Sequence, residues 1–167
     1  MKIKNGTHRT VFIGKYLTIK IPRILNTLRI IKNLPHSHFR AIYFDFKQLV
    51  VRSFLEGSKE NWNEFLCWRE NKADFLVPVY FSIGMVEIQK TVHLEEISED
   101  EINKIWASLV KLNREMVWEA DHHTLANRLN YHKDAKKYKM VDYGGRGIRE
   151  LVKRYRKELD EILSIKI

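Results

Sequence analysis

The sequence predicts an α+β fold, with a small antiparallel sheet and inserted helices in residues 1–92 and a mainly helical part in residues 93–167. Three observations lead to this prediction. Two pairs of runs rich in β-branched and aromatic residues have the lengths of short strands. Apolar side chains recur at three- and four-residue intervals through much of the remaining chain. Finally, 44% of the 167 residues are hydrophobic, which is enough to build a core.

A hairpin is the first expected element. Residues 11–14 and 16–21 are two strand-like runs separated by one lysine, and Pro22 ends the second run because proline has no N–H to donate. Residues 76–92 predict a second pair of strands joined by a tight turn. The two pairs together predict the antiparallel sheet.

Helical spacing predicts helices between these two strand pairs. Residues 25–31 and 39–54 carry apolar side chains every three or four positions, which favours two amphipathic helices. Gly57 and Ser58 interrupt the pattern. Serine is a common capping residue, so we expect Ser58 to start a further helix that runs through Arg69.

The second half of the chain predicts a long helix, a short strand and a final helix. Ser98 and Glu101 have the spacing of a capping box, and the helix that they begin carries an apolar stripe over roughly five turns. Residues 121–127 fit neither the helical nor the strand period. Residues 138–141 have the composition of a short strand, and residues 148–162 show helical spacing again.

The charge of the chain is unevenly distributed. Its net charge is +9, its sequence pI is near 9.6, and lysine and arginine are concentrated between Arg128 and Lys157. Such a region attracts polyanions, so it predicts an acidic protein or a nucleic acid as partner. A solvated basic face that maintains solubility has the same composition, and the sequence leaves both interpretations open.

Cysteine content and hydropathy restrict the class of protein. Cys67 is the single cysteine, so no intramolecular disulfide forms, and we expect it to be a small core residue. No apolar run approaches the roughly 18 residues that cross a bilayer, and residues 1–6 lack the apolar segment of a signal peptide. We therefore expect a cytoplasmic protein with no membrane partner.

Three short patterns are candidates for chemistry. Lys20 lies inside a strand-like run, where a rigidly held cation can neutralise phosphate, although an edge-strand lysine looks the same in sequence. Asp142 follows a hydrophobic run in Val-Asp-Tyr-Gly, which suits a magnesium ligand or an ordinary turn. The loop of residues 121–127 reads Asp-His-His-Thr-Leu-Ala-Asn. A zinc site from His122, His123, His132 and Asp142 is disfavoured because the spacing matches no zinc pattern.

The order of elements over residues 9–145 resembles that of protein kinases. A strand with Lys20 is followed by a helix with Glu64, two strands, a long helix, a polar loop, and Asp142 in Asp-Tyr-Gly. The nearest likeness is to the aminoglycoside phosphotransferases, to RIO kinases and to small kinase-like proteins of phages. The resemblance implies a two-lobed kinase-like fold, with residues 1–92 as the N-lobe and residues 93–167 as a reduced helical C-lobe.

The resemblance also implies a site for ATP and magnesium between the two lobes. Lys20 would contact the phosphates and Glu64 would position Lys20. Asn127 and Asp142 would hold the metal ion through hard oxygen ligands. Glu60 lies one helical turn before Glu64 and is a competing partner for the lysine.

The resemblance assigns Asp121 or His122 to the acceptor hydroxyl, as the base or the orienting group. Asn127 falls one residue later than the family pattern, so His122 takes the place of the catalytic aspartate when Asn127 is aligned. A histidine accepts a proton but does not supply the carboxylate's charge. The chain also lacks a Gly-x-Gly-x-x-Gly loop, and one predicted helix follows Gly145 where kinases carry a larger substrate-binding region.

Two functions follow from these observations. The first is a kinase-like protein that binds ATP and magnesium and transfers the γ-phosphate to a hydroxyl. The second is a pseudokinase that acts as a basic binding module, with the region between Arg128 and Lys157 contacting a host protein or a nucleic acid.

Overall fold

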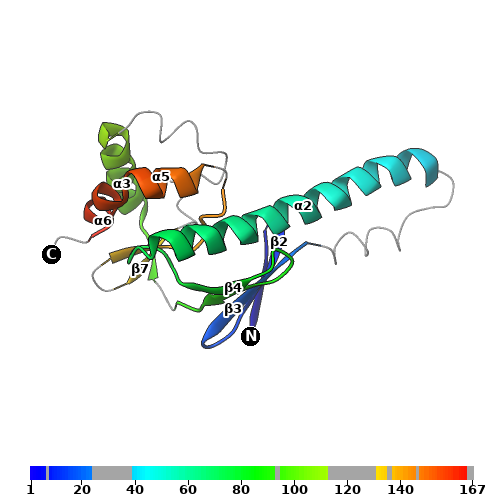
Figure 1. The fold of residues 1–167 in the computed structure, drawn as a ribbon, viewed down its shortest axis with the longest axis horizontal. Helices are drawn as coiled ribbons and strands as arrows, with labels where there is room; N and C mark the ends of the chain where they lie inside the picture. The colour runs from blue at the N-terminus through cyan, green and yellow to red at the C-terminus, as the bar shows by residue number, and fades with distance from the viewer. Residues whose placement is uncertain are drawn as a thin grey trace.

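The computed structural model describes residues 1–6, 8–23, 39–92, 95–112, 131–134, 137–145 and 147–164. These residues form a mixed α+β fold, as the sequence predicts, with a five-stranded antiparallel sheet, a three-stranded sheet and several helices (Figure 1). The helix expected over residues 25–31 lies outside the described residues. Within the described part of the chain, no helix is both long enough and apolar enough to span a bilayer.

The larger sheet contains both predicted strand pairs and one further strand. Neighbouring strands are antiparallel, and their spatial order is β1 (Lys2–Asn5), β2 (Arg9–Ile13), β3 (Leu17–Pro22), β5 (Glu87–Lys90) and β4 (Val79–Ser82). The sequence does not predict β1, whose four residues contain only one apolar side chain. The order places β3 inside the sheet, with a strand hydrogen-bonded on each side.

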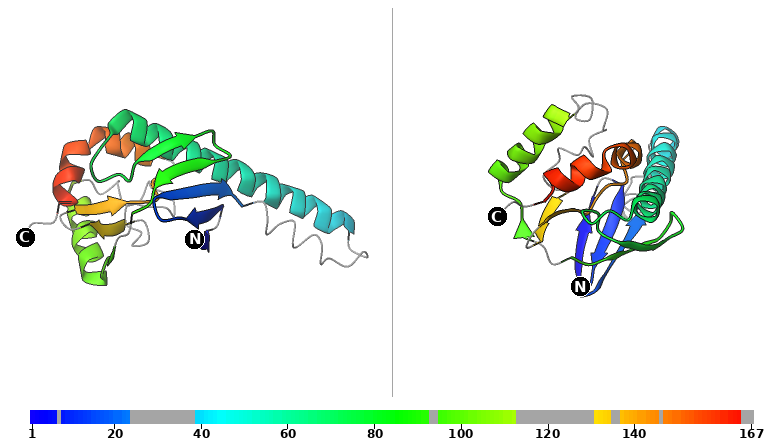
Figure 2. Two further views of the ribbon diagram at one scale, coloured as in Figure 1. Left: turned by 90° about the horizontal axis from the view of Figure 1, so that it is seen from below. Right: turned by 60° about the vertical axis from the view of Figure 1, so that its left-hand side comes forward.

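Helix α2 (Phe39–Asn71) is one continuous helix of 33 residues that packs on the sheet and extends past it (Figures 1 and 2). The predicted break at Gly57 and Ser58 is therefore wrong. A Cβ atom added to Gly57 would lie 2.6 Å from the carbonyl oxygen of His8 and 3.2 Å from Cα of Pro22. Gly57 is present because the helix backbone touches the sheet there, not because the helix ends.

The sheet face toward α2 is polar, and the opposite face is apolar. On β3, Thr18 and Lys20 are buried, whereas Leu17 and Ile19 are 46% and 39% exposed. Residues paired directly across strands share a face. The outer face consequently carries an apolar row of register neighbours, one from each strand: Ile3, Phe12, Ile19, Ile88 and Phe81.

The smaller sheet and the next helix lie beyond one end of α2. The sheet contains β6 (Glu95–Glu96), β7 (Tyr131–Asp134) and β8 (Lys137–Met140), and β8 corresponds to the strand predicted from the sequence. Helix α3 (Glu99–Leu112) begins at the predicted capping box. The Ser98 backbone N–H donates to Glu101 Oε2 at 3.0 Å, and the Glu101 N–H donates to Ser98 Oγ at 3.3 Å.

The C-terminal residues form two short helices instead of the single predicted helix. Helix α5 (Ile148–Arg154) and helix α6 (Arg156–Ile162) meet at Tyr155, whose φ of −119° is not helical. The predicted apolar residues still face the core, because Ile148, Val152 and Leu159 are fully buried on both sides of this break.

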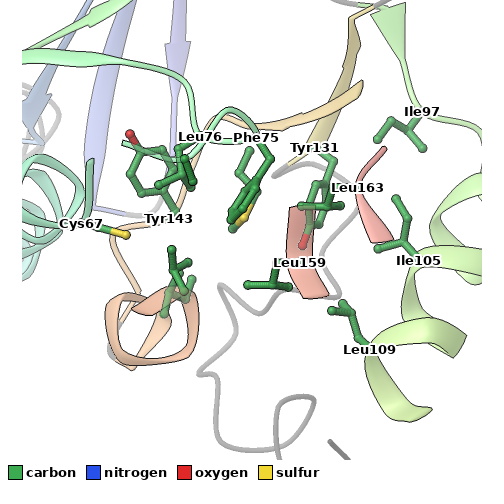
Figure 3. Close-up of a cluster of buried hydrophobic side chains, with 14 of the residues drawn as sticks. Cys67, Phe75, Leu76, Ile97, Ile105, Leu109, Tyr131, Tyr143, Leu159 and Leu163 are labelled. Atoms are coloured by element: carbon green, nitrogen blue, oxygen red, sulfur yellow. The ribbon is translucent and has the colours of Figure 1, made fainter. Parts of the chain in front are cut away.

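The main hydrophobic core lies between the end of α2, the smaller sheet and helices α3, α5 and α6 (Figure 3). It includes Cys67 at the end of α2, which confirms the prediction for the single cysteine. Other core members are Phe75, Leu76, Ile97, Ile105, Leu109, Tyr131, Tyr143, Leu159 and Leu163. The core takes residues from both sides of position 92, and the division into lobes at that position stays a prediction.

Candidate functional site

Lys20 is buried at the contact between the larger sheet and α2. Its ammonium Nζ contacts Glu64 Oε2, lies 3.1 Å from Glu87 Oε1, and donates to the carbonyl oxygen of Val141 at 3.0 Å. The interpretation of Lys20 as an edge-strand lysine is wrong, because β3 lies between β2 and β5. Its cation is instead surrounded by groups from three other segments of the chain.

Glu64, and not Glu60, is the helix residue that pairs with Lys20. Glu64 has no exposed surface, and its two oxygens contact Lys20 and Arg9. Glu60 lies one turn earlier on α2, and its Oε2 is 3.1 Å from Nε of Arg9. The two glutamates are on one face of the helix because their spacing is one helical turn.

Arg9 on β2 is the central cation of the cluster, and sequence reasoning did not single it out. Its side chain is 6% exposed, and all three guanidinium nitrogens face carboxylates. Besides Nε, which faces Glu60, Nη1 lies 2.5 Å from Glu64 Oε1 and Nη2 lies 2.5 Å from Asp142 Oδ1. The fork-shaped donor set of arginine suits such a junction.

Strand register gives a signal by which Arg9 can be found in the sequence. Val11 pairs directly with Lys20, so the two side chains share a face of the sheet. Arg9 lies two residues before Val11 and therefore points to that same face. A lysine and an arginine at these positions of a predicted hairpin indicate a shared charged site.

The Asp-Tyr-Gly segment follows β8 and is held against α2. Asp142 is 31% exposed, so its carboxylate is in contact with both Arg9 and solvent. The Tyr143 hydroxyl donates to the carbonyl oxygen of Val77 at 2.5 Å. A Cβ atom on Gly144 would lie 2.5 Å from the carbonyl oxygen of Glu60, so this glycine permits the close approach of the helix.

Asn61 fixes the turn between β4 and β5 to the helix. Its Nδ2 donates to the carbonyl oxygen of Gly84 at 2.7 Å and to that of Lys20 at 3.3 Å. Its Oδ1 accepts from Arg9 Nη1 at 3.3 Å. This buried amide therefore connects the strand of Lys20, the helix of Glu64 and the guanidinium of Arg9.

The charges in the cluster perturb one another strongly. Burial alone would lower the pKa of Arg9 and that of Lys20, but neighbouring carboxylates raise both above their ordinary values. Asp142 and Glu64 act most strongly on Arg9, and Glu64 and Glu87 on Lys20. Burial and, next, the charge of Glu64 together raise the pKa of Glu87 to about 8. Both cations therefore stay charged at neutral pH.

The donor chemistry of this site suits magnesium. Arg9 and Lys20 face three carboxylates, Glu60, Glu64 and Asp142, besides Glu87 with its raised pKa, so the cluster has one more negative than positive charge, which favours a cation. Asp142 supplies a partly exposed carboxylate, the ligand type that magnesium takes together with phosphate oxygens and water. Across the described ranges, no three His, Cys, Asp or Glu side chains gather as a metal site.

The remaining predicted site residues cannot be placed relative to this cluster. Asp121, His122 and Asn127 lie outside the described residues. The structure therefore brings together Lys20, Glu64 and the segment that contains Asp142, and the expected catalytic loop stays a prediction.

The chain was compared with known proteins. No protein-family model matches it, and no curated protein matches it by sequence.

Proposed function

We propose that the protein is kinase-like and binds ATP with magnesium at the Lys20–Asp142 cluster. The observation that carries this proposal is the buried pair between Lys20 on the third strand and Glu64 on the following helix. In protein kinases a lysine on the third strand contacts the phosphates and pairs with a helix glutamate. The hydrogen bond from Lys20 Nζ to the carbonyl oxygen of Val141 joins this pair to the Asp-Tyr-Gly segment.

The order of the elements also supports the proposal. The lysine strand, the glutamate helix, a strand pair, a helix and a β-hairpin precede Asp142, in the sequence order that the resemblance requires. In the proposed two-lobed arrangement, residues 1–92 are the N-lobe and residues 93–167 are a reduced C-lobe. The ATP site lies between them.

Each residue then has a defined task. Lys20 contacts phosphate oxygens, Glu64 holds Lys20, and Asp142 with Asn127 binds magnesium, which neutralises developing charge on the phosphates. Transfer breaks the bond between the γ-phosphorus and the bridging oxygen and forms a bond to the acceptor hydroxyl oxygen. The hydroxyl proton passes to Asp121 or His122.

Ligand-induced stabilisation tests the binding step. ATP with magnesium should raise the melting temperature of the wild-type protein, since a ligand that binds only the folded state stabilises it by mass action. Asp142→Ala should abolish most of this increase, and Lys20→Met should reduce it. Matched controls are Asp74→Ala and Lys90→Ala, which remove an exposed aspartate and an exposed lysine and should leave the increase unchanged.

A binding role without catalysis is the second candidate, and a specific observation favours it. The outer sheet face exposes the apolar row that includes Ile19 and Phe81. Large exposed apolar surfaces normally mark sites of contact with another molecule. A wild-type protein that binds a protein partner but does not turn over ATP would select this candidate. Release of the γ-phosphate in the presence of wild-type protein, and its absence with Asp142→Ala, would select the enzyme.

A further inference from the structure

Glu87 on β5 has a setting that the proposed function does not explain. Its side chain has no exposed surface, and neither carboxyl oxygen accepts a hydrogen bond from an N–H or O–H group in the described part of the chain. Buried polar groups in proteins nearly always have hydrogen-bond partners, because burial removes the water that would otherwise solvate them. The cost is largest for an ionised carboxylate. A buried glutamate of this kind requires a physical reason.

The position of Glu87 relative to Lys20 suggests that reason. The two residues pair directly across β3 and β5, and Lys20 Nζ lies 3.1 Å from Glu87 Oε1 in a direction that makes no hydrogen bond. The same ammonium contacts Glu64, which is also fully buried. Two buried carboxyl groups thus flank one ammonium.

We propose that Glu87 carries a proton at neutral pH and acts as a positioning residue for Lys20. As a neutral acid it donates its proton in a hydrogen bond to the Glu64 carboxylate. Lys20 then has a single charged glutamate partner, and its ammonium remains able to attract phosphate. This inference rests on the proposed nucleotide site and names a further residue that controls it.

The charged neighbours of Glu87 support the protonated form. Burial most strongly, then the charge of Glu64 on α2 and a hydrogen bond to Glu64, raise the pKa of Glu87, which is about 8 with all neighbours included. Lys20 on β3 and Arg9 on β2 act in the opposite direction. Tyr143, after β8, also lies within the field of Glu87, and burial raises its own pKa, so it stays neutral.

The sign of the effect on stability follows from linkage. The folded protein holds the Glu87 proton up to a pH of about 8, whereas the unfolded chain releases it near the ordinary value of 4.5. Between these two values the folded state binds more protons than the unfolded state. The contribution of Glu87 to the free energy of unfolding therefore falls as pH rises through this window, and it is constant at higher pH.

Glu87→Gln tests the protonated state without any nucleotide. The glutamine amide has the shape of the neutral acid and can donate the same hydrogen bond to Glu64, but it does not ionise. In carboxyl carbon NMR of the wild-type protein, the resonance of Glu87 is assigned as the signal that Glu87→Gln lacks. This resonance should titrate near pH 8. A resonance that titrates near the ordinary glutamate value overturns the inference.

Thermal stability gives a second readout of the same variant. The melting temperature of Glu87→Gln relative to wild type should increase steadily with pH across the window and then stay constant. Glu161→Gln removes an exposed glutamate at the end of α6 and should follow the wild-type profile. Parallel profiles for wild type and Glu87→Gln overturn the inference.

Nucleotide affinity tests the positioning role itself. Between about pH 8 and about pH 9, the affinity of wild-type protein for ATP with magnesium should fall, by at most about tenfold for each pH unit, since one proton is linked to binding. The affinity of Glu87→Gln should not change. Wild-type affinity that is constant across this range overturns the positioning role. Absence of ATP binding in both proteins contradicts the proposed function, and the NMR titration then still decides the protonation of Glu87.

Discussion

Arg9 Nη2 donates to Asp142 Oδ1 at 2.5 Å, and this contact joins strand β2 to the Asp-Tyr-Gly segment 133 residues later in the chain. The same guanidinium also faces Glu60 and Glu64 on α2. Arg9 therefore fixes the position of the proposed magnesium ligand relative to the helix that holds Lys20. Any metal ion at Asp142 shares that carboxylate with a permanent protein cation.

Removal of Arg9 should be strongly destabilising. Arg9→Met leaves buried carboxylates without a counter-charge, and we expect the free energy of unfolding to fall by about 3–5 kcal/mol in urea titrations. The control is Arg149→Met, which removes an arginine that pairs with Glu70 at the surface, where the loss should be under about 1 kcal/mol. Equal losses for the two variants would show that the buried cluster has no special weight.

The reversed polarity of the larger sheet predicts an unusual pair of mutational effects. Ile19→Thr changes an outward-facing residue, so the free energy of unfolding should change by less than about 1 kcal/mol. Lys20→Met, at the adjacent position, should cost about 3 kcal/mol because Glu64 loses a buried partner. Chemical denaturation of both variants measures this difference, and a larger loss for Ile19→Thr would contradict the assignment of the two faces.

Gly144→Ala should displace the Asp-Tyr-Gly segment from α2. The added methyl group would meet the Glu60 carbonyl oxygen at 2.5 Å, a distance that requires backbone movement. We expect a loss of about 1–3 kcal/mol and weaker binding of ATP with magnesium. Gly6→Ala is the matched control, since its methyl group would lie 3.5 Å from the nearest atom, the carbonyl oxygen of Arg9. Similar stability of both alanine variants would refute the tight contact.

The last two helices should be essential to the core. Leu159→Ala removes a fully buried side chain from α6 and should cost about 2–5 kcal/mol, whereas Leu55→Ala, on an exposed part of α2, should cost under about 1 kcal/mol. Deletion of residues 146–167 removes Leu159 with Ile148, Val152 and Leu163, and should prevent cooperative unfolding in calorimetry. A deletion variant that melts as the full chain does would exclude this role.

Local sequence signals predicted most of the described elements. The capping box at Ser98 and Glu101 fixed the start of α3, and the two strand pairs followed from β-branched runs. The break at Gly57 was a wrong prediction because glycine in a helix marks either an end or a close contact, and only tertiary structure distinguishes the two. Tyr155 ended α5 without a glycine or a proline, so no local signal was available.

The candidate site was predictable where it rests on short motifs. Lys20, Glu64 and Asp142 were found through their spacing within a familiar order of elements, and the choice between Glu60 and Glu64 required the packing angle of the helix. Glu87 looks like a solvated charge in the sequence, and Arg9 is recognised only once the register of its hairpin with Lys20 is considered. Their burial arises from the polar inner face of the sheet, which reverses the usual pattern of strand burial.

The glycine contact at Gly57 has a mechanical consequence. Helix α2, with 33 residues, is a rod about 50 Å long, and its backbone approaches the sheet closely at Gly57, near its middle. Glu60 and Glu64 lie on one arm of this rod, one and two turns beyond that point, and the other arm extends away from the sheet (Figure 2). Because the arm with the two glutamates also contacts Gly144 through Glu60 and enters the hydrophobic core through Cys67, the helix presents Glu60 and Glu64 as one rigid unit to Arg9 and Lys20.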